Sequence, residues 1–223
     1  MGEHPDTAST HRQRSQLLSL THRPTAAFKI GGSLLAGSLV VPPLLTVIIP
    51  WSWVLGLILA GGAVVMIAVG VVGLYPRMNE RTPGLAVVGT AGAVIAGVCA
   101  VILIGTVGFA AIVGGLFGVT FPRPTGAFVL LSLVMATGLG SAFVLSGLAL
   151  TRNDHDLGVA GALLAGGGGV VVVATLGEVS RAMVGISPPR WILFLVLGLL
   201  VVDSLAVGYA LHPVGDSRRP PSS

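Results

Sequence analysis

Asp203 lies within the apolar run 199–212 (LLVVDSLAVGYALH), whose other residues mostly suit a lipid environment. Counting along a helix from the polar end of this run places Asp203 about 12 Å deep, close to the middle of a bilayer. A charged carboxylate there costs on the order of 3 kcal/mol or more, so the side chain should face other helices and needs a partner. No Lys, Arg or His lies in the middle of another apolar run, which excludes an ion pair at that depth within the chain. Asp203 could instead be protonated, bind a cation, or face a water-filled cavity or a charged residue of another protein.

Other polar or helix-weakening residues fall at a similar depth. Ser38 and Ser141 each lie about 13 Å from the same edge of the bilayer. Pro42 and Pro43 lack a backbone N–H, so a kink is expected there, with the carbonyls of Ser38 and Leu39 left without helical donors. The sequence therefore predicts a polar layer at mid-membrane. Its members are Asp203, Ser38, Ser141 and the consecutive glycines Gly166, Gly167, Gly168 and Gly169.

Both main features of this layer also have a simpler interpretation. A neutral Asp203 can occupy one hydrogen-bonding site and so fix the packing of the helices. The glycines allow two helices to approach closely, whereas the sharper alternative is a broken helix that lines a binding site. The sequence favours the simpler interpretation of each feature, because one acid without other membrane charges is a weak coupling site.

The remaining candidates for chemistry are weaker. Glu178 and Arg181 lie one helical turn apart, so they can form an interfacial pair that is either structural or faces a substrate. Asp154, His155 and Asp156 adjoin in a polar connection, but a metal site needs more ligands at fixed geometry. The sequence contains no zinc-protease, nucleophile-elbow or phosphate-loop motif. We therefore expect no catalytic centre, metal or cofactor.

The composition identifies the environment in which these residues must be placed. The chain of 223 residues is 53% hydrophobic and only 9% charged, whereas a soluble domain carries about 25% charged residues. Several runs reach the roughly 20 apolar residues that a helix needs to cross a bilayer. The net charge of +4 comes mainly from arginines that flank these runs. This distribution predicts a lipid bilayer as the partner and argues against nucleic-acid binding.

The expected fold is all-α, a polytopic transmembrane helix bundle with a flexible, basic N-terminal tail (1–26) and a short disordered C-terminal tail (212–223). The six predicted spans cover about 27–49, 53–75, 84–108, 126–150, 158–179 and 190–211.

The positive charges orient this bundle in the cell membrane. The side predicted to be cytoplasmic carries Arg12, Arg14, Arg23, Lys29, Arg77, Arg81, Arg152, Arg218 and Arg219. The opposite side carries only Arg123, Arg181 and Arg190. Because cytoplasmic connections are enriched in Lys and Arg, both termini are predicted to be cytoplasmic. An even number of spans agrees with this arrangement.

The uncharged stretch 84–118 is too long for one ordinary crossing, at about 52 Å as a continuous helix. It is rich in glycine toward its end, so we expect the helix to end near residue 108 and an apolar lip to follow. A re-entrant segment is the alternative, in which Gly114 and Gly118 would form a close-packing pair.

A faint internal similarity relates the segments 73–92 and 147–166, which align without gaps. Parallel repeats of this kind occur in transporters. The shared residues are mostly Gly, Ala and Leu, so compositional bias explains much of the similarity.

Two functions from different classes follow from these features. The leading hypothesis is a non-enzymatic accessory or scaffold subunit that assembles with a membrane protein partner or with copies of itself. In that case Asp203 satisfies a helix contact within the chain or across an interface. The alternative is a small transporter or channel for a proton, cation or small solute, in which Asp203 is the coupling group.

Overall fold

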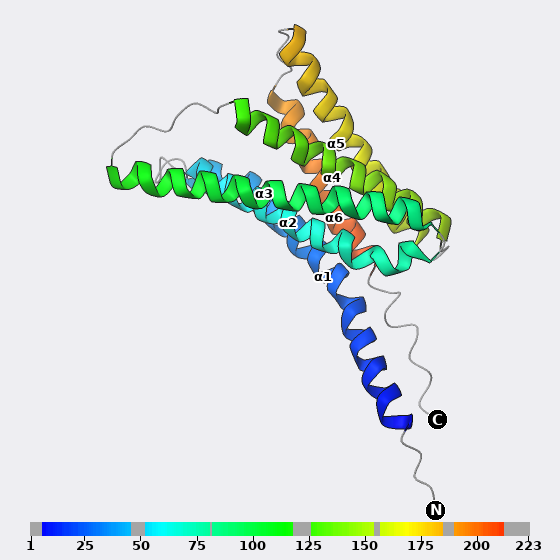
Figure 1. Ribbon diagram of the computed structural model, residues 1–223. Helices are drawn as coiled ribbons and strands as arrows, with labels where there is room; N and C mark the ends of the chain where they lie inside the picture. Colours follow the sequence, from blue (N-terminus) through cyan, green and yellow to red (C-terminus); the bar gives the residue numbers. More distant parts are fainter. Residues whose placement is uncertain are drawn as a thin grey trace, which may run out of the picture.

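The computed structural model describes residues 6–45, 52–80, 82–117, 126–153, 157–184 and 190–211. Within these ranges, it leaves out the side chains at 6–23, 53, 115–117, 153, 178, 180–184 and 190–194. The six helices are α1 (Asp6–Leu45), α2 (Ser52–Asn79), α3 (Pro83–Phe117), α4 (Gly126–Asn153), α5 (Gly158–Val184) and α6 (Arg190–Ala210) (Figure 1). Since the described residues contain no strand, the predicted all-α bundle is confirmed.

Among the described residues, five helices are long and apolar enough to cross a membrane. Their spans are Pro24–Leu45, Val54–Asn79, Pro83–Gly114, Gly126–Arg152 and Gly158–Gly177. In α6 the apolar part with described side chains is shorter, Leu195–Ala210. These bounds agree with the predicted spans to within a few residues at most ends, because a long apolar run is a strong signal for a helix in lipid.

The helices form a closed ring in which each packs against its neighbours in sequence and α6 returns to α1. Figure 1 shows the helices drawn together at one end and diverging toward the other, with α1–α3 leading one way and α4–α6 another. We call the converging end, where α2 and α4 finish, the base. The opposite end, where α1, α3 and α5 finish, is called the open end.

The base holds the main hydrophobic core. Phe28 of α1 and Phe143 of α4 are fully buried and meet across the ring, with 6.4 Å between ring centroids. Around them α3 contributes the buried alanines Ala86, Ala93, Ala96 and Ala100 to the core, and these small side chains allow the helix axes to come close. The ring is closed near this end by Lys29, whose ammonium group lies 4.4 Å from the centre of the Tyr209 ring on α6. This cation–π contact joins the first helix to the last.

Glycines set the closest approaches between helices. At the contact of α4 with α5, a methyl group added to Gly161 would lie 2.7 Å from the carbonyl oxygen of Gly147. One added to Gly147 would meet the backbone of Gly161 and Ala165. Because the obstructing atoms belong to the backbone, neither position can accept a side chain without separating the two helices.

The structure differs from the sequence-based predictions at α1 and α3. Helix α1 begins at Asp6, so helical structure extends through most of the segment 1–26 that was expected to be a flexible tail. From Asp6 to residue 26 that segment contains no glycine, and its three Arg, three Leu and two Gln residues favour a helix, although its three Ser and four Thr residues favour it less.

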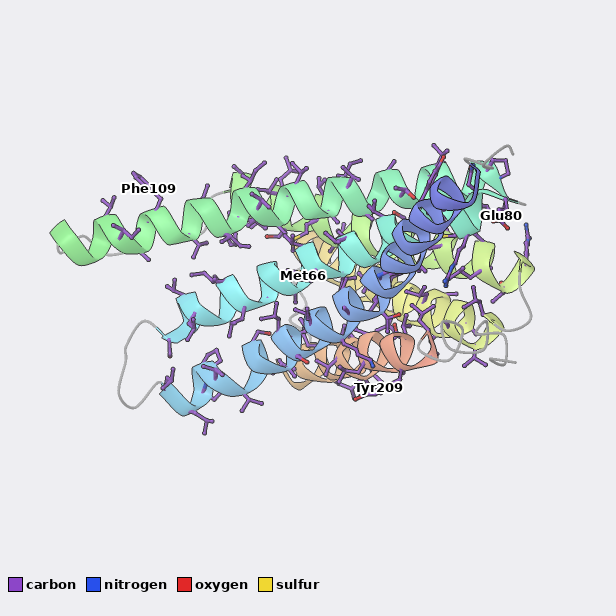
Figure 2. All side chains as sticks on the ribbon, turned by 90° about the horizontal axis from the view of Figure 1, so that it is seen from below. Met66, Glu80, Phe109 and Tyr209 are labelled. Carbon is purple, nitrogen blue, oxygen red and sulfur yellow. The ribbon has the colours of Figure 1, made fainter. Side chains whose placement is uncertain are left out.

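The predicted helix end near residue 108 is wrong, because α3 continues to Phe117. In hydrocarbon a helix that stops leaves backbone groups without partners, so glycines alone do not end it. A helix of 35 residues is about 52 Å long and exceeds the roughly 30 Å apolar thickness of a bilayer, so it must tilt or project. Figure 2 shows Phe109, which is 71% exposed, on the far part of α3 and Glu80 at the opposite end of the bundle.

The internal similarity aligns three pairs of glycines, of which one pair has the same surroundings, since Gly84 and Gly158 both have no atom within 4 Å of an added methyl group. The other two pairs differ. Gly73 packs against Pro24 of α1, whereas its counterpart Gly147 packs against α5. Gly92 packs against Gly138 of α4, while its counterpart Gly166 has no atom within 4 Å of an added methyl group. The surroundings therefore agree at one of the three aligned glycine pairs and differ at two.

The tight α4–α5 contact predicts opposite effects for two Gly→Ala changes. Gly147→Ala should lower the free energy of unfolding by about 1–3 kcal/mol, because the new methyl group meets backbone atoms. Gly166→Ala should leave stability unchanged or raise it by up to about 1 kcal/mol, because the helix gains propensity without a clash. Unfolding in mixed micelles with increasing denaturing detergent measures both. Equal stabilities for the two variants would contradict the observed packing.

Candidate functional site

The candidate site is centred on Asp203, which lies where α6 meets α5. A methyl group added to Gly167 of α5 would lie 2.7 Å from the Cγ atom of Asp203 and still closer to Oδ2. The carboxyl group therefore rests directly on the backbone of α5. Its Oδ2 atom is buried and has no hydrogen-bond partner among the described residues, although the residue as a whole is partly exposed.

The four consecutive glycines divide into two pairs with different surroundings. Gly167 accommodates the carboxyl group of Asp203, and Gly168 packs against Gly140 and Phe143 of α4. Gly166 and Gly169 have nothing within 4 Å of an added methyl group and face outward. Helix α5 runs unbroken through all four. The close-packing interpretation therefore applies to the buried pair, and the broken-helix alternative is wrong.

The two serines of the predicted polar layer lie at other helix contacts. The Ser38 hydroxyl donates to the carbonyl oxygen of Leu35 at 2.7 Å, and the Ser141 hydroxyl donates to that of Gly138 at 3.0 Å. The Ser141 Oγ atom lies 3.1 Å from a methyl group built on Gly92, which places it against α3. Hydroxyl groups in apolar helices commonly bond to their own backbone in this way. The structure therefore does not join these serines to Asp203 in one layer.

Helix α1 passes through both prolines and ends at Leu45. Pro42 packs against Gly56 of α2, where an added methyl group would lie 2.6 Å from its Cγ atom. The carbonyl oxygen of Ser38, predicted to lose its helical donor, lies 3.5 Å from the same methyl position. Pro43 is exposed. Pro42 thus shapes the contact between α1 and α2.

The weaker sequence candidates fall outside the described side chains. Glu178 and Arg181 lie on the last turns of α5, and their side chains are not among those described. Asp154, His155 and Asp156 lie outside the described residues altogether. The interfacial pair and the solvated connection therefore stay predictions.

A cavity of about 270 Å³ occupies the centre of the ring toward the open end. All six helices line it, through residues that include Leu35, Leu57, Leu103, Phe128, Val171 and Leu200. Phe143 and Ile67 lie on its side nearest the base, where the packed core begins. If it were empty, a cavity of this size would cost on the order of 6 kcal/mol, from about 24 cal/mol per Å³. We therefore expect it to hold hydrocarbon.

Ser204 is the polar residue that the sequence-based reasoning missed. It is buried, lines the cavity, and its Oγ atom has no hydrogen-bond partner among the described residues. Ser132 lines the same cavity, but its hydroxyl donates to the carbonyl oxygen of Phe128 at 2.9 Å. The sequence places Ser204 beside Asp203, which marks the region but gives no sign that Ser204 lines an internal space.

No protein-family model, curated protein or solved structure matches this chain. The function is therefore inferred from the geometry and chemistry of this chain.

The partial exposure of Asp203 predicts reaction with a lipid-soluble carbodiimide, since such reagents modify carboxyl groups that they can reach from the bilayer. Dicyclohexylcarbodiimide should add one label to the α6 peptide in the wild type and none in Asp203→Asn. Gly167→Ala should change the labelling rate by displacing the carboxyl group from α5, whereas Gly169→Ala should leave the rate unchanged. Peptide mass spectrometry after reaction in lipid vesicles measures these rates. An unlabelled α6 peptide in the wild type would contradict the exposure of this carboxyl group.

Proposed function

We propose that the chain is a non-enzymatic subunit of a membrane assembly and that it holds a partner helix along the contact between α5 and α6. The observation that carries this proposal is the position of Asp203. Asp203 is partly exposed, and its carboxyl group lies at a helix seam with a buried oxygen that no described residue satisfies. An unsatisfied polar group in hydrocarbon is costly, so it favours association with a helix that supplies a donor.

The surface around this seam suits a second helix. On α5, Gly166 and Gly169 leave open space where side chains would stand. On α6, Leu199 is 48% exposed and Val202 is 65% exposed, and these two residues flank Asp203. Small residues allow the backbones to approach, while the aspartate supplies the polar contact that specifies the partner. This combination is typical of helix association in membranes, where burial of apolar surface does not itself drive contact.

The chemistry of Asp203 indicates what the partner must carry. A carboxylate accepts hydrogen bonds from Arg, Lys or His, and a protonated carboxyl group can also donate to a carbonyl or hydroxyl oxygen. An ion pair at this depth removes the cost of an isolated charge in lipid. A partner helix with a basic residue near mid-membrane is therefore the best match.

The alternative, coupled transport of a proton, cation or small solute, has less support. Asp203 is not among the described residues that line the central cavity, and those that do are apolar apart from Ser132 and Ser204. A hydrated or charged solute would find few polar groups there to replace its water.

The proposal predicts a stoichiometric partner in native mass spectrometry of the protein purified gently from its own membranes. Asp203→Ala should remove the polar contact and release the partner. Gly166→Leu should also release it, because the new side chain fills the space beside Asp203. Inside the chain, that side chain meets no atom within 4 Å at its Cβ position, so the subunit itself should still fold.

The matched control is Gly105→Leu, which makes the same substitution at an open glycine on α3. It should keep the partner. A wild-type protein found only as a monomer would contradict the proposal. Retention of the partner by both Asp203→Ala and Gly166→Leu would contradict the assignment to this surface.

A further inference from the structure

We infer that the central cavity binds a lipophilic molecule that carries one hydrogen-bonding oxygen, such as a medium-chain alcohol or ketone. The oxygen would meet the hydroxyl of Ser204, and the hydrocarbon body would occupy the space toward the open end. This site is separate from the partner surface, which lies on the outside of the ring. The inference therefore does not rest on the proposed function.

The shape and lining of the cavity select an apolar molecule. Its walls come from all six helices, and the packed core closes it toward the base. Its volume of about 270 Å³ exceeds the roughly 150 Å³ of a cavity that stays dry and binds benzene. It lies just below the range of about 300–1,000 Å³ that is usual for small-molecule sites. A single ring with a short substituent, or a medium-length alkyl chain, fits this space.

Ser204 adds the requirement for an oxygen. Several described serines and threonines bond to their own backbone, as Ser33 and Thr175 do to Lys29 and Val171. The buried hydroxyls without a partner among the described residues belong to Ser52, Thr90, Ser146 and Ser204, and of these four residues Ser204 lines the cavity. The Oγ atom of Ser204 has no such bond, although the residue is only 1% exposed. A buried hydroxyl without a partner is disfavoured, so a ligand oxygen at this point gains the contact that the chain leaves open. A plain hydrocarbon would leave it unsatisfied.

Photolabelling with a matched pair of probes tests this inference. The probes are decanol and decane, each carrying the same aliphatic diazirine, added to the full-length protein in lipid nanodiscs. Diazirine-decanol should label cavity residues saturably, and it should reach half-saturation at a lower concentration than diazirine-decane. Ser204→Ala should raise the concentration of diazirine-decanol at half-saturation about 3–10-fold, which is the effect of losing one neutral hydrogen bond. It should leave labelling by diazirine-decane unchanged.

Ser132→Ala is the matched control for the hydroxyl, because Ser132 lines the same cavity but already bonds to its own helix. It should leave the labelling by both probes unchanged. Ala136→Phe fills the cavity and should abolish labelling by both, whereas Ala162→Phe, on the exposed face of α5, should not.

Non-saturable labelling, or labelling that survives Ala136→Phe in a folded protein, would overturn the cavity as a binding site. An equal half-saturating concentration of diazirine-decanol in the wild type and in Ser204→Ala would overturn the role of the hydroxyl and with it the requirement for an oxygen. Folding of every variant is checked by gel filtration, and a misfolded Ala136→Phe is replaced by Ala60→Phe on the opposite wall.

Discussion

Backbone hydrogen bonding in hydrocarbon is the constraint on which the rest of this structure depends. Without water, each peptide group must find its partner inside its own helix. Helix α5 therefore continues through four consecutive glycines, and α3 continues past Gly105 and Gly108 to Phe117. Association of the helices then cannot rely on burial of apolar surface, because lipid is equally apolar. It relies instead on close contact at glycines and alanines, which is why these residues occupy the α4–α5 seam and the α3 face.

This mode of packing is distributed unevenly along the bundle. Toward the base, Phe28 and Phe143 fill the centre of the ring between close-packed helices. Toward the open end the helices diverge (Figure 1), and no comparable pair of large side chains crosses the ring in the described residues. The cavity follows from this difference. Its walls are the faces of helices that meet at the base, so a molecule bound there bears on how far the two groups of helices separate.

The sequence predicted the helices well because each is encoded by a local apolar run, but it predicted the site only in part. Asp203 was identified because a single acid in such a run is conspicuous. The role of Gly167 could not be predicted, because it is one of four consecutive glycines and only the packing of α5 shows which of them faces α6. Ser38 and Ser141 were misleading for a similar reason. Depth along the bilayer can be counted from the sequence, whereas the face of the helix that a side chain occupies depends on which helix packs beside it.

Asp203 and Ser204 are adjacent in sequence, but their side chains lie on different faces of α6 and contact different surroundings. Adjacent residues on an α-helix point about 100° apart. The rotation turns Asp203 toward α5 and the outer surface, while Ser204 turns toward the centre of the ring. The hydroxyl and the carboxyl group, side by side in sequence, therefore meet different surroundings. A ligand in the cavity and a helix on the outer surface would contact the same turn of α6 on different faces. Occupancy of one site should consequently influence the other through the position of α6, without any contact between the two bound molecules.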